Sequence, residues 1–285
     1  MTRRSSPRTR ALRALTGATV AAAITAATPV AAQAAVACNE AALVQAIDDA
    51  NAAGGGNVVL EPLCTYDLAA SHATGANGAN GLPIITTVIT VTGDQNVIRR
   101  SSALGTPAFR IAEVASTGKL TLKLVTLSNG SAVGSGGAIL NFGAVTLTGG
   151  GLTDNTASGT GGGLSNADVA APGTGTAATF TSSTVSGNTA TGQGGGLYNG
   201  LRGSMTTSSS SITSNASSAE GGGIAAVNAT ATSLSSTSVS ANSATAGAGG
   251  IYRLGGTMTI TTSPISGNTP NNCVGSVPSV PGCVA

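Results

Sequence analysis

The chain lacks most of the side chains from which catalytic and metal centres are built. Its 285 residues include no tryptophan, three tyrosines, three phenylalanines and one histidine, and only 8% of them are charged. The single histidine, His72, lies in a loop rich in Gly, Asn and Ala, so neither a histidine metal site nor a catalytic triad is expected. The glycine runs lack the Lys-Ser/Thr pair of a phosphate-binding loop. We therefore predict no catalytic, cofactor-binding or metal-ligating residue.

The first residues are typical of an export signal. Five arginines in the first thirteen positions precede a run rich in Ala, Val, Ile and Leu that ends in Ala32-Gln33-Ala34. Polar residues and a proline interrupt this run, so it is too short to span a membrane. We predict a signal peptide over residues 1–34, cleaved after Ala34 or Ala37. The mature protein would be secreted, extracellular or associated with the cell wall, without a transmembrane segment.

The charge of the mature chain argues against nucleic acid as a partner. Beyond residue 34 the sequence keeps seven basic and ten acidic residues, a net charge of −3. The basic residues are scattered, whereas phosphate binding needs them clustered.

Four cysteines are expected to form two disulfides in an exported protein. Three connectivities are possible, and proximity favours Cys38 with Cys64 and Cys273 with Cys283. The alternative for Cys38 is lipidation, but this would leave Cys64 without a partner, and the leucine that normally stands three places ahead of a lipidated cysteine is absent.

Glycines and asparagines recur at a nearly constant spacing. The second glycine of each doublet lies at Gly137, Gly163, Gly196, Gly223 and Gly250, which gives intervals of 26, 33, 27 and 27. Asparagines stand eight residues earlier, at Asn129, Asn155, Asn188, Asn215 and Asn242, and Asn268 continues the series. The long interval contains a Pro/Gly-rich insertion at 168–176. A repeat of about 26 residues is the signature of a solenoid.

Within each repeat, apolar and hydroxyl residues alternate. Mostly apolar residues stand ten and eight positions before the asparagines: Val145 and Leu147, Ala178 and Phe180, Met205 and Thr207, Thr232 and Leu234, Met258 and Ile260. Hydroxyl residues stand nine and seven positions before: Thr146 and Thr148, Thr179 and Thr181, Thr206 and Ser208, Ser233 and Ser235, Thr259 and Thr261. Alternation with period two indicates strands with one buried face. Two further apolar columns complete the repeat: Leu152, Val185, Ile212, Val239 and Ile265, and Leu164, Leu197, Ile224 and Ile251.

These columns predict an all-β fold, a right-handed parallel β-helix, or β-solenoid, over residues 58–268. Three short strands per turn would stack over about eight turns, and the aligned asparagines would bond to one another along the axis. A capping helix is expected within 35–57, because Asn39 can cap it and Leu43, Val44, Ile47 and Ala50 share a face. Residues 269–285 would close the other end as a disulfide clasp.

Several of these segments resemble a known family. Residues 39–68, residues 80–130 and the glycine-rich repeats resemble secreted right-handed β-helix proteins of actinobacteria. The repeats are similar to those of chlamydial polymorphic outer membrane proteins, which carry GGAI and FxxN motifs. Gly136 to Ile139 is GGAI, but the second motif has an aliphatic residue in place of Phe, as in Val185 to Asn188. Because the chlamydial proteins are surface adhesins, the resemblance implies an adhesin-like role.

Function is less evident than fold. We predict a secreted or cell-surface scaffold for adhesion or interaction, with a cell-surface polysaccharide or protein as partner. The alternative is a polysaccharide lyase or glycoside hydrolase, which needs clustered acidic residues. Its site would lie near the 168–176 loop or near the first turns, where the candidates are Glu61, Asp67, Asp94 and Glu113, with Arg99, Arg100 or Arg110 nearby. A third hypothesis is ice binding through the Thr/Ser columns. Tyr198 and Tyr252 share a column and could stack on a sugar, although isolated surface tyrosines are the plainer interpretation.

Overall fold

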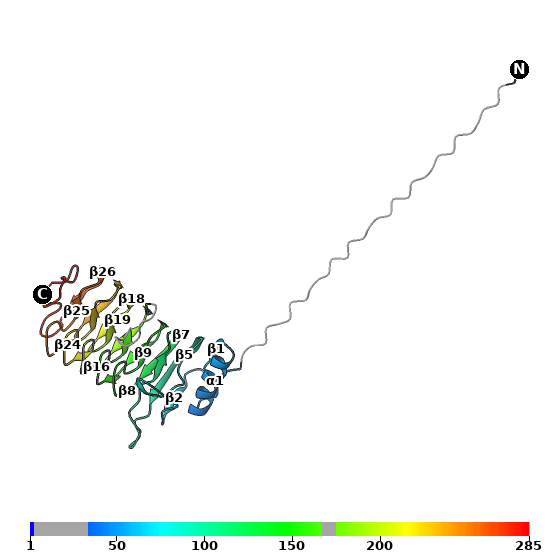
Figure 1. The fold of residues 1–285 in the computed structure, drawn as a ribbon, viewed down its shortest axis with the longest axis horizontal. Helices are drawn as coiled ribbons and strands as arrows, with labels where there is room; N and C mark the ends of the chain where they lie inside the picture. Colours follow the sequence, from blue (N-terminus) through cyan, green and yellow to red (C-terminus); the bar gives the residue numbers. More distant parts are fainter. Residues whose placement is uncertain (3–33, 167–174, 285) are drawn as a thin grey trace. The chain divides into compact units, whose positions relative to one another are not determined.

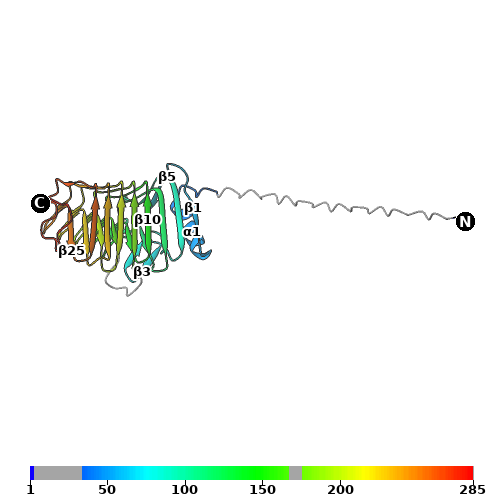
Figure 2. The same cartoon turned by 90° about the horizontal axis from the view of Figure 1, so that it is seen from above.

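The computed structural model describes residues 1–2, 34–166 and 175–284; most of the predicted signal peptide and of the insertion at 168–176 lies outside them. Residues from 34 onward form a parallel β-solenoid, whose strands lie side by side in successive layers (Figure 1, Figure 2). Val185 pairs with Ile212, and Ile212 with Val239, so one turn takes about 27 residues. The predicted fold class is confirmed. In the described part of the chain, no helix is long and apolar enough to cross a membrane.

The largest sheet forms one kinked side of the coil. Its first half stacks β1 (Gly55–Val59), β5 (Val88–Arg100), β7 (Lys119–Ser128), β10 (Ala144–Thr148), β14 (Ala177–Thr181), β18 (Ser204–Ser208), β22 (Ala231–Ser235) and β26 (Thr257–Thr261). Its second half stacks β2 (Thr65–Leu68), β5, β7, β11 (Gly151–Thr153), β15 (Thr184–Ser186), β19 (Ser211–Thr213), β23 (Ser238–Ser240) and β27 (Ile265–Ser266). This sheet therefore contains two of the three strands predicted for each turn, split at a bend in most turns.

The split follows from a residue with positive φ in every layer. The bend carries Leu63, Gln95, Leu124, Gly149, Ser182, Ser209, Ser236 and Thr262, with φ between 46° and 66°. A left-handed residue turns the chain sharply and disfavours bulky side chains. The bend therefore takes small or polar residues in the later layers.

Two further sheets complete each turn. One contains β8 (Ser131–Ala132), β12 (Thr156–Ala157), β16 (Thr189–Ala190), β20 (Ala216–Ser217) and β24 (Ser243–Ala244). The other contains β6 (Ala112–Val114), β9 (Ile139–Asn141), β13 (Leu164–Asn166), β17 (Leu197–Asn199), β21 (Ile224–Val227) and β25 (Ile251–Leu254). This second sheet counts about six complete turns, fewer than the eight predicted, because the early segment includes the antiparallel hairpin of β3 (Ala73–Gly75) and β4 (Gly78–Asn80) instead of further rungs.

The core is a stack of aliphatic side chains in register. The predicted columns are buried through the middle turns; for example, Val185, Ile212 and Val239 are at most 1% exposed. Beside them the asparagine side chains form a continuous ladder, in which the Nδ2 group of each residue donates to the Oδ1 atom of the next. The donor-to-acceptor distances are 2.9 Å from Asn155 to Asn188, 2.9 Å from Asn188 to Asn215, 2.9 Å from Asn215 to Asn242 and 3.0 Å from Asn242 to Asn268.

In the first glycine–asparagine repeat, the register differs by one residue from the register that the spacing predicts. Gly130, rather than Asn129, faces Asn155, and its backbone N–H donates to Asn155 Oδ1 at 2.9 Å. Because Ile139 pairs with Leu164, Gly137 lies over Gly162, not over Gly163. Asn129 instead occupies the left-handed position of the next corner, with φ 59°, where Asp154 stands one turn later with φ 57°. Counting back from the glycine doublet therefore misplaces this layer.

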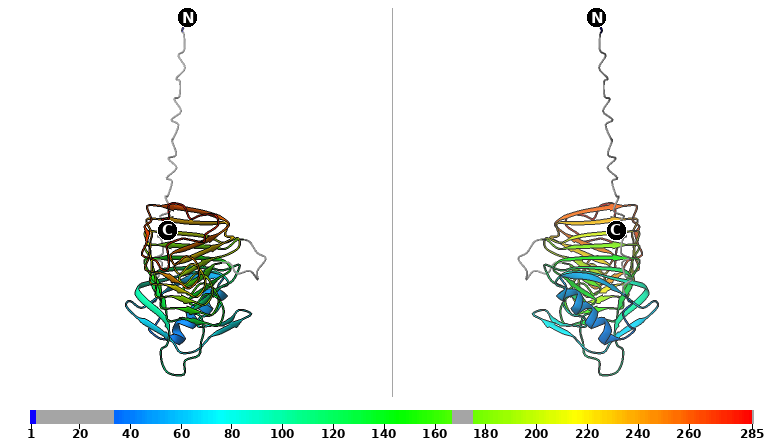
Figure 3. Two further views of the ribbon diagram at one scale, coloured as in Figure 1. Left: turned by 90° about the vertical axis from the view of Figure 1, so that its left-hand side faces the viewer. Right: turned by 90° about the vertical axis from the view of Figure 1, so that its right-hand side faces the viewer.

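Helix α1 (Glu40–Ala52) packs against β1, β2 and β5 at the N-terminal end of the coil (Figure 3). Asn39 is its N-cap and its side chain accepts a hydrogen bond from Ala42 N at 2.9 Å. Leu43, Ile47 and Ala50 are the buried face. Both predicted disulfides, Cys38–Cys64 and Cys273–Cys283, are present, so lipidation of Cys38 does not fit this structure.

The cap is anchored by a carboxylate. Glu40 Oε1 accepts hydrogen bonds from the backbone N–H groups of Ala69 and Ala70 at 3.0 and 3.2 Å, and lies 2.7 Å from His72 Nε2. Desolvation acts to raise the pKa of Glu40, but the bonds from His72 and the two backbone N–H groups outweigh it, and the net pKa is lowered. The same contact gives His72, the single histidine of the sequence, a structural partner in the cap.

Acid is expected to loosen this cap. A carboxylate whose pKa is lower in the folded state stabilises the protein fully above its unfolded value of about 4.3, and the stabilisation is lost as pH falls through the folded value. The protection of the α1 amides against hydrogen exchange, relative to their intrinsic rates at the same pH, should therefore fall in that acidic window. Glu40→Gln should show faster exchange at neutral pH and a flatter pH dependence. An unchanged acid response in Glu40→Gln would assign the effect to other groups.

Candidate functional site

Three of the four acidic residues proposed for catalysis lie in separate contacts. Glu61 Oε2 accepts from Cys38 N at 3.2 Å, whereas Asp67 pairs with Arg99 at 2.5 Å on the surface. Glu113 pairs with Arg110 at 3.1 Å in the interior. In residues 34–166 and 175–284, no group of three His, Cys, Asp or Glu side chains could hold a metal ion. Each of these three carboxylates is thus engaged with a different partner.

Arg110 and Glu113 hold the hairpin against the coil. Arg110 is 1% exposed, and its Nη1 donates to Asn80 Oδ1 at 3.0 Å as well as to Glu113. Its Nη2 donates to the carbonyl oxygens of Asn77 at 2.6 Å and Ser135 at 3.2 Å. The Glu113 carboxylate also accepts from the side chains of Asn77 and Asn80. A buried pair with this many internal bonds serves to fix the β3–β4 hairpin.

Breaking this buried pair is expected to be costly. Arg110→Met should lower the free energy of unfolding by about 3–5 kcal/mol, because it leaves the Glu113 carboxylate buried without its countercharge. The double variant Arg110→Met/Glu113→Met should lose less than the single one. The control, Arg99→Met, removes an exposed pair and should change stability by less than about 1 kcal/mol. Denaturant unfolding measures all three, and equal losses in Arg110→Met and Arg99→Met would refute the anchoring role.

The two tyrosines do not form a sugar-stacking platform. Tyr198 and Tyr252 share a column, since both pair with Ala225. Tyr198, however, is only 9% exposed, and Tyr252 is half-buried. A sugar ring therefore has access to one of them at most.

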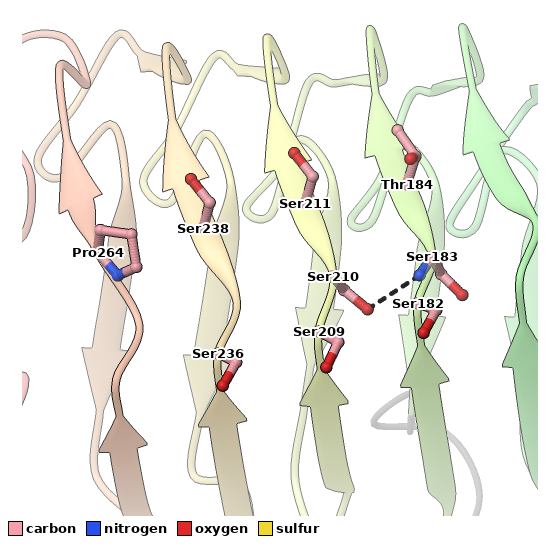
Figure 4. Close-up of a pocket in the computed structure, with 9 residues that line it drawn as sticks. All are labelled: Ser182, Ser183, Thr184, Ser209, Ser210, Ser211, Ser236, Ser238 and Pro264. Carbon is pink, nitrogen blue, oxygen red and sulfur yellow. Dashed lines mark hydrogen bonds between the residues drawn. The ribbon is translucent and has the colours of Figure 1, made fainter.

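The feature that stands out is a groove along the bend of the large sheet. It has a volume of about 520 Å³ and runs across successive turns (Figure 4). Its lining contains eight hydroxyl residues, one proline and no ionisable or aromatic side chain: Ser182, Ser183, Thr184, Ser209, Ser210, Ser211, Ser236, Ser238 and Pro264.

The floor of the groove is structural. Ser183 and Ser210, which line the groove, and Thr237, which occupies the same position one turn later, are at most 7% exposed. Each hydroxyl donates to the carbonyl oxygen two residues earlier, at 2.8, 2.8 and 3.1 Å respectively. Ser210 Oγ also accepts from Ser183 N in the neighbouring turn, at 3.1 Å. These side chains are small and bonded within the bend, so they leave the groove above them unfilled.

The walls of the groove are available to a ligand. Ser182, Ser209 and Ser236 lie on one side of the floor, and Thr184, Ser211 and Ser238 lie on the other (Figure 4). Among the described residues, the hydroxyls of Ser182, Ser209, Thr184, Ser211 and Ser238 have no hydrogen bond to another protein group. Their backbone register repeats from turn to turn. The result is a linear array of free hydroxyls on a neutral surface.

The array of free hydroxyls ends at the turns that precede β14. Leu124 occupies the bend position next to Gly149, where an added Cβ would lie 2.7 Å from the Leu124 Cδ2 atom. The adjacent outward columns also change there, because Thr148 pairs with Lys123 and Ala144 with Lys119. The neutral hydroxyl surface thus belongs to the later turns.

The sequence contained an unused signal for the groove. Hydroxyl residues stand both six and five positions before four successive asparagines: Ser182 and Ser183, Ser209 and Ser210, Ser236 and Thr237, Thr262 and Ser263. A second buried ladder was also missed. Asn141 donates to Asn166 at 2.7 Å and Asn166 to Asn199 at 2.8 Å, and each of these follows the apolar column of its turn by two residues.

Comparisons with known proteins give no functional lead: no protein-family model, curated protein or solved structure matches the chain. The resemblance to actinobacterial β-helix proteins and chlamydial repeats therefore stays a prediction, and function must be inferred from the groove.

Proposed function

We propose that this protein is a secreted, non-catalytic scaffold that binds an extended neutral polysaccharide along the groove. The supporting observation is the array of unpaired hydroxyls, in register over several turns, on a lining without any ionisable group. Hydroxyls both donate and accept, so they can match the hydroxyls of a sugar chain. A neutral lining offers an anionic chain such as a polyuronate no countercharge. The two disulfides are compatible with an extracellular location.

The predicted affinity per sugar is low. Without aromatic stacking, each contact is a hydrogen bond exchanged with water, which contributes about 0.5–1.5 kcal/mol. Useful binding then depends on many equivalent contacts along one chain. A repeated groove on a solenoid provides this arrangement.

Retention on polysaccharides tests the proposal. The protein should bind neutral glucans or chitin and should not bind polyuronates. The variant Thr184→Val/Ser211→Ala/Ser238→Ala removes three wall hydroxyls and should weaken binding about tenfold or more, if each contributes as above. The matched control, Thr156→Val/Thr189→Val/Ser243→Ala, removes exposed hydroxyls from β12, β16 and β24 and should bind normally. Equal loss of binding in both variants, or no retention on any neutral polymer, would reject the groove as the polysaccharide-binding site.

The enzyme alternative makes a different prediction. A lyase or hydrolase would release soluble products from these polymers, with or without calcium. The scaffold proposal expects no release. Turnover that disappears in Asp94→Asn, with the fold intact, would favour the enzyme alternative over the scaffold proposal. Ice binding stays a prediction of the hydroxyl columns, and a measurement of thermal hysteresis tests it.

A further inference from the structure

The groove stops at the layer of β14 and β15, although the bend of the large sheet continues through every earlier layer. Its lining begins at residues 182–184. In the preceding layer the strand registers place residues 149–151 beside them, and all three are glycines. Glycines in place of hydroxyl residues leave more room at the bend, so the groove should extend into this layer rather than end before it.

The side chain of Leu124 fills the space that the glycines leave. An added Cβ on Gly149 would have only Leu124 within 4 Å, with the Cδ2 and Cγ atoms at 2.7 and 3.8 Å. Leu124 belongs to the preceding turn and is 46% exposed, so part of it projects beyond the sheet. The two bend residues before it, Gln95 and Leu63, are also exposed. These three side chains form a ridge in line with the groove.

Leucine is an unusual residue for this position. Leu124 has φ 54°, in the left-handed region where a bulky side chain is disfavoured, and nearly half of it lies in water. In the layers that line the groove, serine occupies the same position with φ of 48–49°. Neither backbone conformation nor burial therefore accounts for a leucine here. Backbone outliers of this kind are concentrated at sites that contact ligands.

We infer that Leu124 sets the length of sugar chain that the groove holds, an inference that rests on the proposed function. A chain lying across the turns meets the Leu124 side chain directly beyond Ser182, because that side chain covers Gly149. Contacts with the bend are therefore limited to the turns from β14 onward. Without Leu124 the same chain gains one further layer, about 4.8 Å along the axis of the coil.

A double substitution that continues the hydroxyl array tests this role. In Leu124→Ser/Gly149→Ser the leucine is gone, so the added Gly149 Cβ meets no other group and the variant should fold. In calorimetric titrations with neutral oligosaccharides of increasing length, its affinity should level off at a longer chain than in wild type. It should also rise about two- to tenfold for each added hydrogen bond. Leu124→Gly opens the layer without adding hydroxyls and should shift the same length with a smaller rise.

The matched control is Leu63→Ser. Leu63 is another exposed leucine of the bend, with φ 58°, but it lies two turns further from the groove than Leu124. Its replacement should leave the titrations as in wild type. If wild-type affinity levels off with length and both Leu124 variants level off at that same length, Leu124 does not end the groove, although the groove itself stands. A wild type without length-dependent binding would reject the proposed function, and this inference with it.

Discussion

Asn215→Ala is expected to lower the free energy of unfolding by about 3–5 kcal/mol, since it leaves several buried polar groups unsatisfied at about 1–3 kcal/mol each. The Asn215 side chain is 1% exposed. Its Oδ1 accepts from Asn188 N at 3.0 Å and from Asn188 Nδ2 at 2.9 Å, and its Nδ2 donates to Val185 O at 3.0 Å. Alanine therefore deprives the preceding turn of one acceptor, which serves two N–H groups of Asn188, and of one donor.

Chemical denaturation of Asn215→Ala beside Ser218→Ala provides the comparison. Ser218 is exposed on the same turn, and its replacement should change stability by less than about 0.5 kcal/mol. If Asn215→Ala were as stable as Ser218→Ala, the ladder would contribute nothing to the stacking of turns.

Gly222→Ala is expected to be strongly destabilising for so small a substitution. An added Cβ would meet the backbone carbonyl oxygens of Ser243 and Gly249, the latter at 2.6 Å, both in the next turn. Since these are backbone atoms in a hydrogen-bonded layer, relief requires the turns to separate. Overpacking typically costs about 1–3 kcal/mol, and a rigid neighbour places this site at the upper end or beyond. Poor expression or a large fall in melting temperature is the expected result.

A matched glycine separates steric clash from a general glycine effect. At Gly56 the added Cβ would lie 3.6 Å from the Ala50 Cβ, an ordinary contact, and the backbone there is compatible with alanine. Gly56→Ala should therefore be neutral or stabilise by about 0.4–1 kcal/mol. Similar destabilisation at both positions would show that the close approach of turns at Gly222 is not the cause.

The coil itself was predictable because its signals repeat. One alternating segment is weak, but the same apolar and asparagine spacing in successive segments indicates stacked rungs. The helix cap at Asn39 and the two disulfides followed from equally local rules. The first layer was misaligned because a glycine doublet is ambiguous by one position, and its true register depends on the pairing of Ile139 with Leu164.

The groove was not predicted, because it depends on backbone conformation rather than on residue pattern. Ser182, Ser209 and Ser236 adopt positive φ values of 48–49°, which serine signals poorly. The sheet kinks there, and neighbouring serines become a floor and two walls. Sequence alone showed serines in a serine-rich chain, and only the fold distinguishes bonded hydroxyls from free ones.

The most direct test of the groove is the dependence of affinity on the length of a neutral oligosaccharide, measured by titration calorimetry. Binding along equivalent steps on successive turns predicts that affinity rises with each added sugar until the chain spans the groove, and then levels off. The Thr184→Val/Ser211→Ala/Ser238→Ala variant should flatten that rise. Affinity independent of length would indicate a single local pocket and would contradict the extended site.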